Sequence, residues 1–139
     1  MLLVDTGVFV AAADLDDRHH QRCAALLQTP DGPLVTTALV IVEAGWLIRR
    51  QLGTAAEVAL YKALAAGGVG VIDLTAADWV RVAGLLETYA DIDLDAADAS
   101  IIAVAERLNQ TVIATLDERD FRSVRPSHAD AFDLLPGLH

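Results

Sequence analysis

The chain has little that could cross-link it or carry it into a membrane. Its one cysteine, Cys23, excludes an internal disulfide and a cysteine-rich zinc site. No apolar run approaches the roughly 18 residues of a membrane span, and the first residues, MLLVDTG, lack the basic segment of a signal peptide. We therefore expect a cytoplasmic protein that does not associate with membranes.

Basic residues are also scarce. Ten Lys and Arg residues stand against 20 Asp and Glu residues, which gives a net charge of −10. Nucleic-acid affinity is largely electrostatic and needs basic side chains, so the charge taken alone argues against a broad nucleic-acid-binding surface. Any partner of this kind has to be held through a few selected contacts.

The residues that are present predict one α/β domain over 1–139. Hydrophobic residues make up 54% of the chain and charged residues 22%, a balance typical of a folded protein. Short apolar stretches alternate with helical patterns, and this order predicts a parallel sheet covered by helices. The predicted strands are 1–5, 34–37, 69–74, 111–115 and 131–135. The predicted helices are 6–13, 18–28, 38–52, 54–66, 75–89 and 96–108, whereas 119–124 is expected to form a loop or short turn.

Capping residues mark several of these helix starts. Thr54 with Glu57 and Thr75 with Asp78 have the spacing of a capping box, in which two residues three apart bond each other's backbone N–H groups. Asp95 is expected to cap helix 96–108.

Two acidic residues follow predicted strands. Asp5 ends the first strand, and Asp117 comes just after the fourth. Ligands bind at the carboxyl ends of strands in open parallel sheets, so both positions are candidates for a site. The structural alternatives stay open: Asp5 can cap the following helix, in competition with Thr6, and Asp117 can be an ordinary turn residue.

Two further acids lie on helix faces that should turn inward. Asp98 could complete a capping box with Asp95, but Ile101 and Ile102 follow it at helical spacing. Glu43 could lie at the rim of the core or be covered by Arg49 or Arg50, although neither arginine is correctly spaced to pair with it. Its neighbours three and four residues away are all apolar: Leu39, Val40, Trp46 and Leu47.

Together, two strand ends and two inward helix faces can converge at one edge of the sheet. Several carboxylates cannot stay ionised side by side without a compensating cation, because like charges raise their pKa values. A set of oxygen ligands without clustered His or Cys suits Mg²⁺, with Mn²⁺ as the alternative. Such ions commonly serve phosphoryl transfer.

Three stretches carry a resemblance to a known family: LLVDTGVFVAAAD, TTALVIVEAGWL and LDAADASIIAVAERLNQTVIATLDERDF. Over essentially its full length the chain resembles the PIN-domain ribonucleases, and specifically the VapC toxins of bacterial VapBC toxin–antitoxin pairs. The resemblance implies a PIN-like three-layer α/β/α domain with a mostly parallel sheet of about five strands.

The resemblance also implies roles for individual residues. The acidic site of the family maps onto the four acids singled out above, Asp5, Glu43, Asp98 and Asp117. Of these, Asp5, Asp98 and Asp117 are expected to hold the metal, and Glu43 to position water or support the ligands. Thr6 and Thr115 match hydroxyl positions beside the metal, Asp95 is expected to act as the helix cap, and Asp120 as a loop contact.

The resemblance implies that the protein is a Mg²⁺-dependent endoribonuclease and the toxin component of a type II toxin–antitoxin system. Its implied substrate is a structured RNA such as a tRNA or rRNA, and a cognate VapB-like antitoxin neutralises it. The alternative on the same fold is a non-catalytic RNA- or protein-binding module, which the complete acidic set disfavours. A hydrolase with Asp5 as nucleophile typically needs Asp-x-Asp or a partner lysine, but position 7 is glycine and the only lysine is Lys62. The phosphate-binding glycine motifs of nucleotide-binding proteins do not occur.

The surface residues suggest how partners bind. The candidate RNA contacts are Arg18, Arg49, Arg50, Arg119, Arg122 and Arg125. Helices 38–52 and 54–66 carry more apolar side chains than a small monomer easily hides: Val40, Ile41, Val42, Trp46, Leu47, Ile48, Val58, Leu60, Tyr61 and Leu64. We expect this surface to serve a homodimer and a groove for the antitoxin's C-terminal segment, whose arginine would pair with the site's carboxylates.

Overall fold

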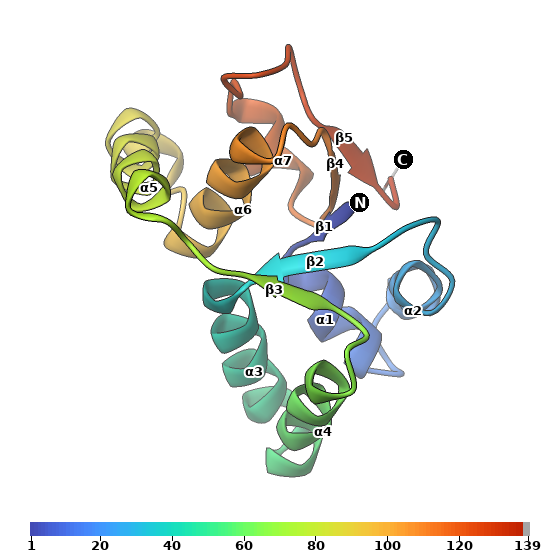
Figure 1. Cartoon of the computed structure of the whole chain (residues 1–139). Helices are drawn as coiled ribbons and strands as arrows, with labels where there is room; N and C mark the ends of the chain where they lie inside the picture. The colour runs from blue at the N-terminus through green and yellow to red at the C-terminus, as the bar shows by residue number, and fades with distance from the viewer. Residues whose placement is uncertain (138–139) are drawn as a thin grey trace.

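The computed structural model describes residues 1–137 and places a five-stranded parallel sheet between two layers of helices (Figure 1). The strands are β1 (Leu2–Val4), β2 (Leu34–Thr37), β3 (Gly70–Ile72), β4 (Val112–Ala114) and β5 (Asp133–Leu135), in the order β3-β2-β1-β4-β5. All four pairings are parallel. The expected three-layer α/β/α fold is confirmed, and the last two residues of the predicted 1–139 domain lie outside the described residues.

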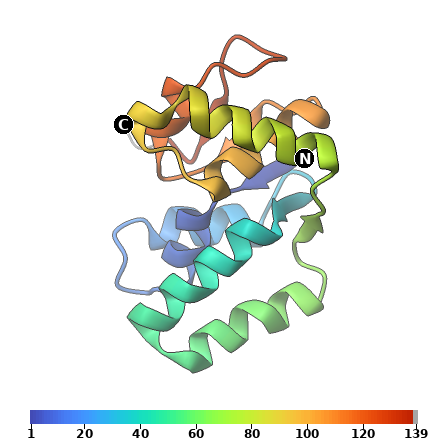
Figure 2. The ribbon, with the colours of Figure 1, turned by 90° about the vertical axis from the view of Figure 1, so that its left-hand side faces the viewer.

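The helices divide between the two faces of the sheet (Figures 1 and 2). One layer contains α1 (Thr6–Ala13), α2 (His20–Gln28), α3 (Ala38–Leu52) and α4 (Thr54–Ala65). The other contains α5 (Ala76–Thr88), α6 (Ala96–Arg107) and α7 (Glu118–Ser123), with a short 3₁₀ turn at Ala90–Ile92. No helix within residues 1–137 combines the length and apolar character needed to cross a bilayer.

The hydrophobic core is built mainly from the central strands of the sheet and from α6. Leu3, Val4, Ile113 and Ala114 are fully buried, as expected for parallel strands covered on both faces. Residues 97–105 of α6 are buried without interruption. Because all five strands run the same way, their carboxyl ends meet at one edge, and β1, β2 and β4 each lead there into the next helix.

Two local predictions are wrong. Residues 118–123 form the helix α7 and not a loop, because the Asp117 side chain caps it and the buried Phe121 packs edge-to-face on Phe132. Thr54 and Glu57 form no capping box: Gly53 occupies the cap position, and the Glu57 carboxylate accepts a hydrogen bond from the Tyr61 hydroxyl at 2.7 Å. The Thr75–Asp78 box is confirmed in both directions.

The apolar surface of α3 and α4 is smaller than expected. Val40, Ile41 and Ile48 are buried in the core, and Leu47, Leu60 and Leu64 are half-buried against it. The expected residues that stay exposed are Val42, Trp46, Val58 and Tyr61. The prediction therefore overstated the surface free for partners, because α3 uses much of its apolar side to pack on the sheet and on α1.

Candidate functional site

A polar cavity of about 320 Å³ opens at the carboxyl edge of the sheet. Its lining residues are Asp5, Thr6, Gly7, Glu43, Leu47, Asp95, Asp98, Leu116 and Asp117. The four acids singled out in the sequence thus reach one cavity from four places: the end of β1, helix α3, helix α6 and the turn after β4.

Asp5 and Asp117 are linked through Thr115. The fully buried Thr115 hydroxyl donates to Asp5 Oδ2 at 2.9 Å, and its oxygen accepts the Asp117 backbone N–H at 2.9 Å. Asp5 is itself only 3% exposed, and its side chain does not cap α1. Asp5 Oδ1 is buried without a hydrogen-bond partner, whereas the Thr6 hydroxyl lies close enough to the Glu43 carboxylate to lower its pKa. An unpaired buried oxygen is costly, so Asp5 Oδ1 indicates a position where a cation could bind.

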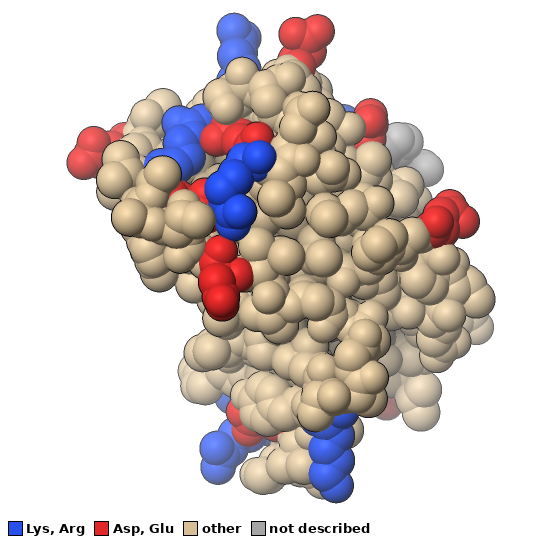
Figure 3. Space-filling view, viewed as in Figure 1, with Lys and Arg blue, Asp and Glu red and all other residues tan. Residues whose placement is uncertain are grey.

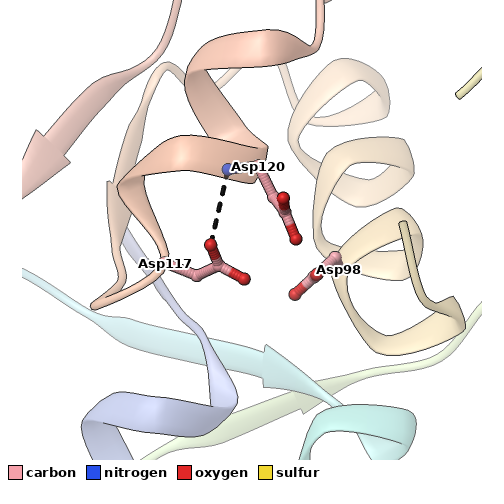
Figure 4. A group of neighbouring side chains, drawn as sticks. All are labelled: Asp98, Asp117 and Asp120. Atoms are coloured by element: carbon pink, nitrogen blue, oxygen red, sulfur yellow. Dashed lines mark hydrogen bonds between the residues drawn. The ribbon is translucent and has the colours of Figure 1, made fainter. Parts of the chain in front are cut away.

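Asp98 is held at the start of α6 by its backbone. Its N–H donates to Asp95 Oδ1 at 2.8 Å, so Asp95 is the cap that the sequence predicted. The Asp98 carboxylate, in contrast, does not return the bond that would complete a capping box. It lies opposite the carboxylate of Asp117, in the turn after β4 (Figure 4). The capping explanation therefore accounts for Asp95 but not for the Asp98 side chain.

Asp98, Asp117 and Asp120 form the tightest acidic group. One carboxylate oxygen of each lies within 4.8 Å of the others, and the Asp120 backbone N–H donates to Asp117 Oδ1 at 3.4 Å (Figure 4). Asp120 was expected to be a loop contact, but it lies in α7 and its carboxylate belongs to this acidic group. Asp117 and Asp120 are the cap and third residue of α7, just as Asp95 and Asp98 are in α6. The missed helix concealed this signal.

Burial and mutual repulsion raise the pKa values of four acids in or beside the cavity, Asp5, Glu43, Asp98 and Asp120. Desolvation raises the pKa of Asp98 to about 9, with further contributions from the charges of Asp5, Asp95, Asp117 and Asp120. Burial likewise raises the pKa of Asp5 to about 6, partly offset by the Thr6 amide and the Thr115 hydroxyl. The pKa of Glu43 is raised by burial and then by Asp95, and that of Asp120 by burial and then by Asp117.

Arg119 is near enough to lower the pKa of Asp120, but it does not pair with the acidic group. Among residues 1–137, no Lys, Arg or His forms an ion pair with Asp5, Glu43, Asp98, Asp117 or Asp120. The two arginines considered for Glu43 are engaged elsewhere: Arg49 pairs with Glu57 at 3.8 Å, and Arg50 lies 4.7 Å from the Trp46 ring. Oxygen-only donors that form no ion pair within the described chain, one of them buried and unpaired, fit a hard divalent cation such as Mg²⁺ or Mn²⁺.

The chain is similar to known proteins over most of its length. The profile of the PIN domain matches residues 2–125. Ribonuclease VapC26 of Mycobacterium tuberculosis is 27% identical over 135 residues, which cover 97% of this chain and 100% of that protein.

Two solved structures share the fold. Mycobacterium tuberculosis VapC20, described as a sarcin-ricin loop cleaving toxin, superposes with a TM-score of 0.75 at 22% identity, covering 81% of this chain and 87% of its own. FitAcB from Neisseria gonorrhoeae superposes with a TM-score of 0.52 at 23% identity, covering 83% and 86%.

Proposed function

The chain belongs to the PIN-domain family, and we propose that it is a divalent-metal-dependent endoribonuclease of the VapC type. The observation that carries the proposal is the acidic cavity, in which five carboxylates converge and none forms an ion pair with a basic side chain of the described residues. The similarity to a protein named ribonuclease VapC26, over nearly the whole of both chains, supports RNA as the substrate.

Asp98, Asp117 and Asp120 are the residues that would hold the ion, with Asp5 beside them. When bound, a divalent ion would offset the carboxylate charges and stabilise negative charge on the phosphate oxygens of the scissile bond. Thr115 orients Asp5 through the 2.9 Å hydrogen bond and fixes the turn that carries Asp117. Glu43 lines the same cavity from α3, and we assign to its carboxylate the positioning of the attacking water.

The substrate we propose is a structured RNA recognised through few contacts, a tRNA or rRNA. Arg49, Arg81, Arg107 and Arg122 pair with acidic side chains of the protein itself. On the face that Figure 3 shows, basic side chains occur in small groups next to acidic ones. This charge pattern supports recognition of RNA shape over general attraction to phosphate. The structural relative described as cleaving the sarcin-ricin loop is consistent with such a substrate.

We further propose that the protein acts in the cytoplasm as the toxin of a toxin–antitoxin pair and forms a homodimer. The exposed side chains of Val42, Trp46, Val58 and Tyr61 offer apolar surface on α3 and α4. The uncompensated acidic cavity would attract an arginine of a VapB-like antitoxin, which would compete with the metal for the carboxylates. Light scattering of the purified protein and capture of the adjacent gene's product test these two assignments.

Cleavage of RNA under metal control tests the proposed activity. Purified protein should cut a structured RNA in Mg²⁺ or Mn²⁺, lose this activity in EDTA and regain it when the metal is returned. Protein that binds the same RNA without cutting it would support the non-catalytic module instead. Cleavage that survives EDTA would contradict the assignment of the acidic cavity.

A further inference from the structure

Two buried hydroxyl groups lie in the elements that carry Glu43 and Asp98 to the acidic cavity, but they are not part of its lining. Thr37 ends β2 and caps α3, and Ser100 lies in α6. Both residues are fully buried, and Thr37 Oγ1 and Ser100 Oγ are 2.7 Å apart. Neither side chain lines the cavity or joins the acidic group, so the chemistry proposed above gives them no role.

The surrounding bonds fix the direction of this hydrogen bond. The Ser100 hydroxyl donates to the Ala97 carbonyl oxygen at 2.7 Å, which uses its one proton. The Thr37 hydroxyl must therefore donate to Ser100 Oγ, while Thr37 Oγ1 accepts the Val40 backbone N–H at 3.3 Å. Each donor in this series of hydrogen bonds, from the Val40 N–H to the Ser100 hydroxyl, has an acceptor. A fully satisfied buried network of this kind is rigid.

The hydroxyl pair joins the two helices that bring acids to the cavity from opposite faces of the sheet. Helix α3 carries Glu43, and helix α6 begins with Asp95 and Asp98. Within residues 1–137, the Thr37–Ser100 bond is the one side-chain hydrogen bond between these elements. The carboxylates they carry repel one another, so in the metal-free protein the charges work to separate the two helix starts.

We infer that Thr37 and Ser100 form a hydroxyl clamp, which holds the start of α3 against the start of α6. The clamp would keep Asp98, one of the residues that would hold the ion, in place opposite Glu43 in the cavity that both line. The inference rests on the proposed metal site, for which the clamp would prepare the geometry. Both are positioning residues, since they act through the helices and touch neither metal nor substrate. Residues that orient a metal's ligands commonly change metal affinity by about 10- to 100-fold when they are substituted.

Mn²⁺ titration of the metal-free protein tests the clamp. Thr37→Val and Ser100→Ala should each weaken Mn²⁺ binding by about tenfold, and the double variant should be no weaker than the poorer single variant, because either change breaks the same bond. Thr37→Ser keeps the hydroxyl and should bind Mn²⁺ like the wild type. Titrations are run at a temperature at which every variant is fully folded.

Thr75→Val is the matched control. Thr75 also caps a helix, accepting the Asp78 backbone N–H at 3.1 Å, but α5 brings no acid to the cavity. This variant should lose stability as Thr37→Val does and keep the wild-type Mn²⁺ affinity. If Thr37→Val and Ser100→Ala also keep that affinity, the clamp is merely structural and the inference is overturned. A wild-type protein that binds no Mn²⁺ would overturn the proposed function and the clamp together.

Discussion

Asp78 and Asp98 occupy the same position in two neighbouring helices. Each is the third residue of its helix, and each donates its backbone N–H to the side chain of the capping residue, Thr75 at 3.1 Å and Asp95 at 2.8 Å. Both are deeply buried, at 3% and 6% exposure. Judged by helix position, backbone hydrogen bond and burial alone, the two aspartates are equivalent.

Their surroundings differ completely. The Asp78 carboxylate accepts the Thr75 N–H at 3.0 Å and is paired with Arg107 Nε at 2.9 Å. The Asp98 carboxylate faces other carboxylates and no cation of the described chain. Asp78 therefore stabilises the fold, because the fold supplies its partner, whereas under the proposed function the partner of Asp98 would be an ion from outside.

The largest expected difference between the two positions is in activity. Asp98→Asn should reduce metal-dependent RNA cleavage by about 10³-fold, because it removes a group that would hold the ion and with it several kcal/mol of transition-state stabilisation. Asp78→Asn, which is equally buried, should stay within a few-fold of the wild type. Single-turnover cleavage rates check this, and an active Asp98→Asn protein would remove Asp98 from the site.

The next difference concerns stability. Asp78→Asn should lower the free energy of unfolding by about 2 kcal/mol, because it weakens the capping box and leaves Arg107 without its buried partner. Asp98→Asn should instead stabilise the metal-free protein by relieving repulsion. Urea unfolding in EDTA measures both free energies of unfolding. If the two substitutions changed this free energy in the same direction, the proposed difference between Asp78 and Asp98 would be contradicted.

The pH dependence of stability should follow the acidic cavity. The pKa values of Asp5 and Asp98 are raised in the folded protein, to about 6 and about 9, so the native state binds protons that the unfolded chain has released. The stability this provides is complete below about pH 4 and is lost as the pH rises through these values. The Tm of the metal-free protein should therefore fall by about 5 °C between pH 5 and pH 9.

The variants again separate the two positions in this measurement. Asp98→Asn should flatten the decline in Tm, whereas Asp78→Asn should keep the wild-type slope. Added Mg²⁺ should raise the Tm most at high pH, where the carboxylates are ionised. A metal-free Tm that rises with pH over this range would contradict the described electrostatics.

The smallest predicted effect marks the edge of the acidic group. Asp120 is half-buried at its rim, and its Asn variant should weaken Mn²⁺ binding by about tenfold, less than Asp98→Asn does. Titration calorimetry of the two variants side by side makes this comparison. Equal losses would place Asp120 at the centre of the site instead.

The fold was predictable because its signals are local and repeated. Apolar strands alternate with amphipathic helices along the whole chain, and a parallel order puts the strand ends at one edge. The failures come from interactions over a longer range. Helix α7 is short and depends on Phe121 packing against Phe132, which no local pattern reveals. Glu57 has capping spacing after Thr54, but its carboxylate bonds Tyr61 instead.

Four of the site's acids were predictable, because their positions in the local sequence pattern are unusual. Asp5, Glu43, Asp98 and Asp117 stood out because a strand end or an apolar helix face is an unusual place for a carboxylate. Asp120 was undervalued because its helix was missed. The local sequence around Asp78 or Asp98 does not show this contrast, because the partner of Asp78 is Arg107 at the far end of α6, 29 residues further along the chain. Only the folded structure shows which buried acid has a partner.

Diffraction from a crystal soaked in Mn²⁺, recorded to reveal anomalous scattering, tests the difference between the two aspartates most directly. The account predicts an anomalous peak among the carboxylates of Asp98, Asp117 and Asp120, at the cavity that Asp98 and Asp117 line with Asp5, and none beside Asp78. A cavity without a peak at saturating Mn²⁺, or a peak beside Asp78 and Arg107, would contradict it.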